Sequence, residues 1–310
     1  MKNEIKIFSP ATVANVSCGF DVLGFALDTV GDEMIIRKVP QKGIQITKIN
    51  DQNLPLETNK NVAGVAALAL LAETNIEFGF EIEINKKIKP GSGIGSSAAS
   101  SAGAVWAINE LLGSPFNTTD LVRFAMEGEK LASGEAHADN VAPAIFGGFT
   151  LIRSYNPLDI IKIPTPKDLI VTIIHPQIEI KTSEARKLLS QTVSLKNATK
   201  QWANVGGLIS GLHTNDYDLI GRSLQDFVAE PVRSKLIPGF NKLKQTCLET
   251  GALGCGISGS GPSIFVLSKG EKKALEVSEA MKTVYNKVGI AYDLHVSKVN
   301  NKGIKILDTK

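Results

Sequence analysis

Glycine is concentrated in three short segments of this 310-residue chain, residues 19–24, 91–95 and 251–261. Because glycine has no Cβ, it lets the backbone take left-handed conformations and lets a ligand or another backbone come close. Each segment lies between stretches that have the pattern of regular secondary structure, so each is expected to be a loop at the end of a strand or helix. The fold must therefore hold three loops where backbones can meet closely.

The patterns between these loops predict an α+β fold. Phe80, Ile82 and Ile84 alternate with polar residues, which indicates a half-buried strand, and the apolar run at 169–174 indicates a buried strand. Three prolines at 157–168 mark the expected boundary between an N-terminal unit, 1–165, and a C-terminal unit, 166–310. Other strands are expected at 4–8, within 33–49, at 263–268 and at 291–299, and helices at 59–72, from 96 to about 113, at 118–132, within 183–250 and at 271–288.

Composition excludes several classes of protein. The 34 basic and 31 acidic side chains leave a formal charge of +3, which argues against nucleic acid or an acidic membrane surface as the main partner. None of the three cysteines lies in a C-x-x-C pair, which indicates a reducing compartment and no zinc site. The N-terminus lacks the apolar stretch of a signal peptide, and the longest apolar run, 62–72, is too short to span a bilayer. We expect a soluble cytoplasmic protein.

The loop at 91–95 has the composition of a phosphate-binding site. Its alternating glycines are followed by Ser96, Ser97 and the start of a helix, so backbone N–H groups and serine hydroxyls can gather around a phosphate or a Mg²⁺ ion. The loop lacks the lysine of a Walker motif and has a different spacing from the dinucleotide fingerprint. A flexible turn between strand and helix is the alternative.

Helical spacing separates two glutamates of the segment 118–132. Glu129 falls on the same face as Leu121 and Val122, whereas Glu127 projects almost opposite. A carboxylate on a buried face is costly unless it binds a cation or is paired. The alternatives are therefore a metal ligand and a structural salt bridge.

Two further groups of polar side chains lie among small and apolar residues. Asn15 and Asp21 stand in the segment P-A-T-V-A-N-V-S-C-G-F-D, where a zwitterionic amino acid could partner them or where they could stabilise a turn between strands. His137, Asp139 and Asn140 form a dense polar group before an apolar run, and three such residues in four positions favour a functional role over a structural one.

These motifs resemble those of the GHMP kinases. The stretch K-P-G-S-G-I-G-S-S-A-A-S at 89–100 is similar to the family's phosphate loop, P-x-x-x-G-[LI]-G-S-S-A, although Lys89 stands where the family usually has proline. The segments 10–25 and 137–148 resemble the homoserine kinase branch of the family, as do 181–186 and 230–238. The segment 254–263 resembles the family's C-terminal glycine motif.

The resemblance implies a fold and an activity. The fold is an N-terminal domain like domain 2 of ribosomal protein S5 and a ferredoxin-like C-terminal domain, with the active site between the two. The activity is the ATP- and Mg²⁺-dependent phosphorylation of L-homoserine to O-phospho-L-homoserine, a step of threonine biosynthesis, and the family suggests a homodimer. Alternatives are another small-molecule kinase of the family and a catalytically silent amino acid or nucleotide sensor.

The resemblance also implies roles for individual residues. Several GHMP kinases have an aspartate as catalytic base near the position of Asn140. The amide of Asn140 cannot accept a proton. We therefore expect the substrate hydroxyl to attack directly, with Asp139 or a phosphate oxygen receiving its proton. Catalysis falls to Asp139, Asn140 and Arg186, and Mg²⁺ binding to Ser97 and Glu129. Homoserine binding falls to Asn15, Asp21, His137, Asp139, Thr182, Arg186 and Arg233, and nucleotide binding to Asn61 at the adenine, Gly259, and Pro90, Gly91, Ser92, Gly93, Ile94, Gly95, Ser96 and Ser97 at the phosphates.

Overall fold

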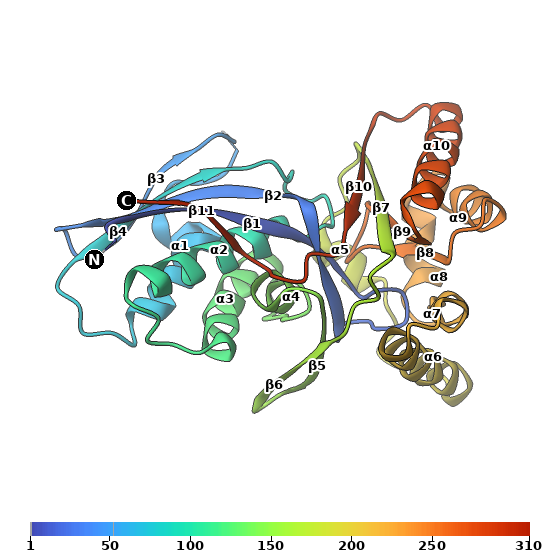
Figure 1. Cartoon of the computed structure of the whole chain (residues 1–310), viewed down its shortest axis with the longest axis horizontal. Helices are drawn as coiled ribbons and strands as arrows, with labels where there is room; N and C mark the ends of the chain where they lie inside the picture. Colours follow the sequence, from blue (N-terminus) through green and yellow to red (C-terminus); the bar gives the residue numbers. More distant parts are fainter. Residues whose placement is uncertain (1, 52) are drawn as a thin grey trace.

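The computed structural model describes residues 2–51 and 53–310, which form two sheets side by side, each with its own helices (Figure 1). The first sheet has the strand order β11-β1-β2-β4-β3, and the hairpin of β5 and β6 joins it through β2. All its neighbouring strands are antiparallel except β3 and β4. Its strands are β1 (Glu4–Ala14), β2 (Leu23–Val39), β3 (Gly43–Ile49), β4 (Gly79–Asn85), β5 (Phe149–Tyr155), β6 (Leu158–Ile163) and β11 (Lys305–Thr309).

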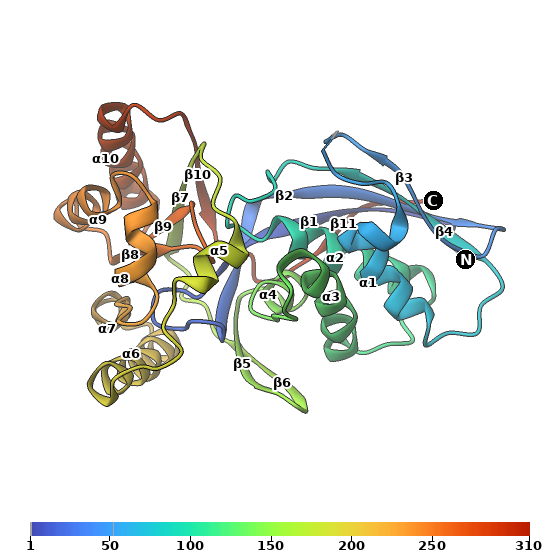
Figure 2. The same cartoon turned by 180° about the vertical axis from the view of Figure 1, so that it is seen from behind.

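Four helices pack against the first sheet and against one another (Figure 2). The central one, α2, is rich in alanine, serine and glycine, so its neighbours can approach closely on all sides, and most of its residues are buried. By contrast α3 is amphipathic and buries Leu121, Val122 and Phe124 while Glu127 is exposed. The four are α1 (Val62–Leu71), α2 (Ser96–Leu111), α3 (Thr118–Ser133) and α4 (Val141–Phe146), and η1 (Thr58–Lys60) precedes α1.

The second sheet is fully antiparallel, with the order β10-β7-β9-β8, and it is covered by α9 and α10. Every residue of β7 is buried, as its continuous apolar run predicts. No helix among the described residues is long and apolar enough to cross a membrane. The elements of this half are β7 (Leu169–Pro176), α5 (Thr182–Lys187), α6 (Leu195–Thr214), α7 (Tyr217–Ser223), α8 (Glu230–Arg233), η2 (Ser234–Leu236), α9 (Phe240–Glu249), β8 (Gly254–Ile257), β9 (Ile264–Lys269), α10 (Glu271–Val288) and β10 (Tyr292–Lys298).

The structure differs from the sequence prediction at several strands. β1 runs on to Ala14, past its expected end at residue 8, and β2 begins at Leu23 instead of near residue 33. β5 was not expected, and β6 occupies the proline-flanked stretch taken as a boundary. The chain does not end with β10, because β11 returns to the first sheet and pairs with β1. The division at residue 165 stays a prediction. β11 comes from the C-terminal side of that division but belongs to the first sheet.

The two halves share an apolar core at their junction. Phe25 of β2 and Phe149 of β5 lie with ring centroids 4.7 Å apart, and Phe265 of β9 meets Phe25 edge-on at 6.1 Å. All three side chains are fully buried in one cluster that draws on both sheets. Burial of aromatic side chains of this size contributes strongly to stability, so the halves are held in a fixed relation.

Gly24 of β2 provides a close approach beside this core. A Cβ at this position would lie 1.9 Å from the carbonyl oxygen of Asp139, which is closer than any real contact. The absence of a side chain therefore lets the segment that precedes α4 lie directly on β2.

We predict that Gly24→Ala lowers the free energy of unfolding by about 2 kcal/mol or more, because a backbone atom must move to make room. The matched control is Gly206→Ala in α6, where the added Cβ would meet no described atom within 4 Å outside its chain neighbours and the nearby helix backbone. That variant should gain up to about 1 kcal/mol from the helix propensity of alanine. Urea denaturation of both variants measures the difference, and equal stabilities would contradict the close approach.

Candidate active site

A cavity of about 620 Å³ lies between the two halves and is lined by loops from both. On the first half it is lined by the turn after β1, the segment from Leu54 to the start of α1, the phosphate loop with Lys86 before it, α3, and the segment that precedes α4. The second half contributes α5, α8 and the loop after β8. A cavity therefore lies where the resemblance implies the active site, between the two halves.

The phosphate loop alternates between residues that face the cavity and residues that point away. Gly91, Gly93 and Gly95 have φ values of 74°, 81° and 70°, in the left-handed region that glycine favours, and all three line the cavity. Ser92 and Ile94 between them are buried, with exposures of 1% and 3%. The loop runs directly into the N-terminus of α2, where backbone N–H groups suit an anion.

The glycine loop of the second half supports the phosphate loop. A Cβ on Gly93 would lie 2.5 Å from the carbonyl oxygen of Gly261, so these backbones touch. The Ser258 hydroxyl donates to the carbonyl of Gly93 at 2.7 Å, and the Ser263 N–H donates to the carbonyl of Ser92 at 3.2 Å. The close approach predicted for the segment 251–261 is therefore, in part, a contact with the other loop.

Glu129 is a buried carboxylate beside the start of α2. Its side chain is 7% exposed, and its Oε1 finds no hydrogen-bond partner within residues 2–51 and 53–310. Burial raises the pKa of Glu129 to about 7, against the opposing effects of the Ser97 hydroxyl and the Lys86 charge. A buried oxygen of this kind fits a cation, and one carboxylate with a hydroxyl suits Mg²⁺ that also binds phosphate oxygens.

A buried ion pair that we did not predict lies next to this group. The Lys86 ammonium donates to the Asp32 carboxylate, to the carbonyl of Ser96 at 2.8 Å and to the Ser100 hydroxyl at 3.1 Å. Its burial lowers the Lys86 pKa, and the charge of Asp32 opposes that shift. Asp32 lies on the same buried face of β2 as Met34. The alternation of side chains along this strand could have indicated a buried aspartate that needs a partner.

Asp21 and Arg186 form a bidentate ion pair that also lines the cavity. Arg186 donates from Nη2 to Oδ2 of Asp21 at 2.7 Å and from Nη1 to Oδ1 at 3.3 Å, and Nη2 also lies 2.9 Å from Glu135. The backbone N–H of Asp21 donates to Oδ1 of Asn15 at 3.0 Å. The first half and α5 therefore meet through opposite charges.

The turn that carries this pair is strained. Asn15, Val16, Ser17 and Asp21 have φ values of 69°, 42°, 58° and 60°, which is unusual for residues other than glycine. Asparagine and aspartate tolerate this conformation, but a β-branched valine does not. Strain of this kind persists only where neighbouring contacts impose it, and such positions cluster at functional sites.

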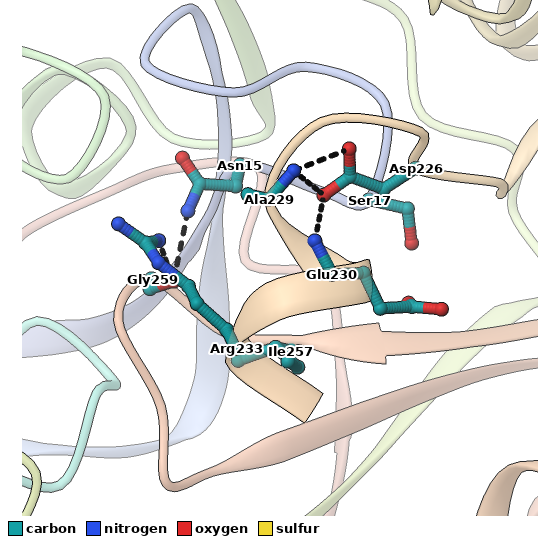
Figure 3. A pocket seen from close by; sticks show the side chains of 8 residues that line it. All are labelled: Asn15, Ser17, Asp226, Ala229, Glu230, Arg233, Ile257 and Gly259. Carbon is teal, nitrogen blue, oxygen red and sulfur yellow. Dashed lines mark hydrogen bonds between the residues drawn. The ribbon is translucent and has the colours of Figure 1, made fainter. Parts of the chain in front are cut away.

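Arg233 and Asn15 converge on one carbonyl. Nη1 of Arg233 and Nδ2 of Asn15 each donate to the carbonyl of Gly259 at 2.9 Å, and Figure 3 shows the three side by side. Asp226 accepts hydrogen bonds from the N–H groups of Ala229 and Glu230, which fixes the start of the short helix that carries Arg233. The N–H of Gly259 donates to the carbonyl of Ala14. Gly259 therefore contacts Asn15 and Arg233 through its carbonyl alone.

The residues at 137–140 lie between the two ends of the cavity. His137 makes a 2.9 Å contact through Nε2 with the Glu135 carboxylate. Asp139 is 4% exposed, and its pKa is raised to about 7, first by burial and then by the charge of Asp21, while His137 opposes the shift. Oδ1 of Asn140 accepts a hydrogen bond from the Thr12 hydroxyl at 2.8 Å, so the amide nitrogen is the end left to donate elsewhere.

Comparison with known proteins decides the family. A model described as GHMP kinases N terminal domain matches residues 61–148, and one described as GHMP kinases C terminal matches 208–287. A homoserine kinase of Chlorobium phaeobacteroides (strain BS1) is 49% identical over 97% of this chain and 98% of its own length. The chain belongs to the homoserine kinases of the GHMP kinase family.

Solved structures agree with this membership. A homoserine kinase from Cytophaga hutchinsonii is 53% identical, with a TM-score of 0.95 over 99% of this chain and 98% of its own. A mevalonate kinase of L. major, solved with R-mevalonate, is 16% identical with a TM-score of 0.71 over 95% of this chain and 96% of its own, and it shares the fold alone. The predicted family, the two-part α+β GHMP kinase fold and the kinase activity toward a hydroxyl group are confirmed.

Most residues expected to act in this homoserine kinase site line the cavity. Thr182 does so with its hydroxyl 3.1 Å from that of Ser260. Asn61 does not line it, because its side chain caps α1 at Ala63 N–H, 3.0 Å away, and donates to the carbonyl of Pro55 at 2.8 Å. The expected site residues that line the cavity are Asn15, Asp21, Pro90, Gly91, Gly93, Gly95, Ser96, Ser97, Glu129, His137, Asp139, Asn140, Thr182, Arg186, Arg233 and Gly259.

Three residues assigned to the nucleotide do not line the cavity with their side chains. Asn61 makes hydrogen bonds from both ends of its amide within the first half, and the side chains of Ser92 and Ile94 are buried. Near Asn61, Leu54, Lys60 and Val62 line the cavity instead. The contacts of these three residues with the nucleotide stay predictions, and those of Ser92 and Ile94 fall to backbone groups.

Proposed function

We propose that this chain transfers the γ-phosphoryl group of ATP to the side-chain hydroxyl of L-homoserine, giving O-phospho-L-homoserine and ADP. The observation that carries this proposal is that two kinds of group line one cavity. One is the phosphate loop together with Glu129, and the other is the Asp21–Arg186 pair. An amino acid with a hydroxyl at the end of its side chain can reach from the charged pair to the phosphates.

The charged pair supports an amino acid as the acceptor. Asp21 and Arg186 offer a negative and a positive group a few ångströms apart, which matches the ammonium and carboxylate of a zwitterion. On this proposal the ammonium replaces Arg186 as the partner of Asp21. The carboxylate then binds Arg186 and Arg233, whose planar donor groups suit it, while Asn15, His137 and Thr182 complete the pocket.

The phosphate loop supports ATP as the donor, and Ser97 and Glu129 would hold the Mg²⁺ that accompanies it. Bound there, Mg²⁺ would neutralise charge on the phosphate oxygens. The loop would bind the phosphates through its N–H groups and the N-terminus of α2. Lys86 lies within the same part of the cavity and adds a buried positive charge that Asp32 holds in place.

The remaining groups would act on the proton and the transferring phosphoryl group. Asp139, with its raised pKa, would receive the proton of the homoserine hydroxyl, and a phosphate oxygen is the alternative acceptor. Asn140 would donate from its amide nitrogen to the phosphoryl oxygens, since Thr12 already occupies its amide oxygen. Arg186 would contribute to catalysis by orienting homoserine, since it binds the substrate carboxylate.

We also propose that the protein acts in the cytoplasm, in threonine biosynthesis, as a homodimer. The homoserine kinase relatives support the pathway, and the sequence composition supports the compartment. The dimer rests on the family resemblance alone.

The first test is ADP release with L-homoserine, mevalonate, galactose and shikimate, each with and without Mg²⁺. We expect Mg²⁺-dependent turnover with L-homoserine only. Arg186→Met should lower kcat/KM for homoserine by about 100-fold, the scale for losing a hydrogen-bonded contact between charged groups. The exposed Arg222→Met is the matched control and should match the wild type. No turnover with homoserine would overturn the proposal.

The second test concerns the proton acceptor. If Asp139 receives the proton it must be ionised, so kcat should rise with pH and level off above about 7, the pKa of the buried carboxyl. Asp139→Asn should lower kcat by a factor of about 100 or more and abolish that rise. The exposed Asp218→Asn controls for loss of charge. Full kcat and an unchanged pH profile in Asp139→Asn would assign the proton to a phosphate oxygen.

A further inference from the structure

Tyr155 links two separate parts of the proposed homoserine pocket through one oxygen atom. Its hydroxyl donates to the backbone carbonyl of Asp21 at 3.0 Å and accepts from the backbone N–H of Ala138 at 3.3 Å. Ala138 stands between His137 and Asp139, so the same oxygen contacts both segments that carry acidic groups of the pocket. Tyr155 itself does not line the cavity.

The pairing of β5 with β2 explains how Tyr155 reaches this position. Leu151 lies opposite Leu23, the first residue of β2, and the N–H of Ile152 donates to the carbonyl of Val22 at 2.8 Å. β5 continues past the start of β2 and ends at Tyr155, beside the turn that carries Asp21. Since β6 pairs with β5 along this stretch, the tyrosine projects from a two-stranded support.

Asp21 depends on such a contact because of its conformation. Its φ of 60° is in the left-handed region, so the residue is held by its neighbours rather than by its own preference. Asn15 binds its N–H, Arg186 binds its carboxylate and Tyr155 binds its carbonyl. The contact with Arg186 must change when a substrate carboxylate binds, so the two backbone contacts are the ones that can keep Asp21 in place.

The other segment is held in a similar way. The carbonyl of Asp139 lies against Gly24 of β2, where a Cβ would come within 1.9 Å of it. Ala138, one residue earlier, is fully buried and gives its N–H to Tyr155. The hydrogen bond to Tyr155 and the contact with Gly24 together hold the backbone at 138–139 in place. They therefore set the direction in which the side chains of His137 and Asp139 point.

We propose that Tyr155 is a positioning residue for the amino acid substrate: its hydroxyl sets the distance between the Asp21 carboxylate and the His137–Asp139 segment. This inference rests on the proposed function, because it assigns that pocket to homoserine. It concerns the homoserine pocket only, since the hydrogen bonds of Tyr155 among the described residues go to Asp21 and Ala138 and none goes to the phosphate loop.

A proton-transfer role for Tyr155 is not needed to explain these contacts. Burial, and then the negative charge of Asp139, raises the pKa of the phenol above its ordinary value. The group therefore stays protonated and keeps its donor bond to Asp21 across the pH range of activity. Removing the oxygen should change the geometry of the pocket without changing its charge.

The test is Tyr155→Phe, which removes the oxygen and keeps the ring. We expect the KM for L-homoserine to rise about tenfold, the scale for losing one hydrogen-bonding group, with the KM for ATP within about twofold of the wild type. The melting temperature should change by less than about 3 °C, since the ring is 40% exposed and its packing is kept. Tyr292→Phe is the matched control, because it likewise removes one tyrosine hydroxyl, which donates to Oδ1 of Asn286 at 3.0 Å and does not line the cavity.

The outcomes separate this inference from the proposed function. No homoserine turnover by the wild type would overturn both. Wild-type turnover with an unchanged homoserine KM in Tyr155→Phe would overturn the inference alone. So would an equal loss for both substrates, or a fall in melting temperature without a change in the homoserine KM, since each indicates a merely structural tyrosine.

A double-mutant cycle tests whether Tyr155 acts through Asp21. In an Asp21→Asn background the carboxylate that Tyr155 would position is gone, so Tyr155→Phe should raise the homoserine KM by clearly less than in the wild type. Additive effects would show that Tyr155 acts independently of Asp21 and would overturn the positioning role.

Discussion

The contact between two glycine loops is the constraint on which the rest of the site depends. Gly93 of the phosphate loop lies against Gly261 and Ser258 of the other half, at a distance that no side chain would allow. The loop after β8 also binds the N-terminal turn, because Gly259 donates to the carbonyl of Ala14 and accepts from Asn15. Three chain segments far apart in the sequence therefore meet at one point, and the nucleotide end and the amino acid end of the cavity have a fixed relation.

Charge arranges the cavity around that contact. Asp32 and Lys86 are paired with each other, as are Asp21 and Arg186, so neither pair leaves an isolated buried charge. Glu129 and Asp139 are different, because burial raises the pKa of both carboxyls to about 7. A bound cation would restore the charge of Glu129, and Asp139 is suited to take up a proton near neutral pH. The near-neutral net charge of the whole chain is thus compatible with a strongly polar site.

The sequence was sufficient for features with strong local patterns. Helical periodicity separated buried Glu129 from exposed Glu127, and the glycine and serine spacing located the loop before α2. Contacts between distant segments left no such pattern, which is why the hydrogen bonds of Tyr155 and the return of β11 to β1 were not predicted. A motif does not say which of its side chains point inward, so the sequence did not show that the side chains of Ser92 and Ile94 are buried. Nor did it show that the Asn61 side chain caps α1, and the contact of Asn61 with adenine stays a prediction.

The central claim is that one cavity holds a zwitterion at the Asp21–Arg186 end and phosphates at the glycine-loop end. A crystal structure with L-homoserine, Mg²⁺ and a non-hydrolysable ATP analogue tests it most directly. The account predicts that the homoserine ammonium contacts Asp21, that its carboxylate contacts Arg186 and Arg233, and that its hydroxyl points toward the γ-phosphate near Asp139. Homoserine bound elsewhere, or bound with the Asp21–Arg186 pair intact and its hydroxyl turned away from the phosphates, would contradict the account.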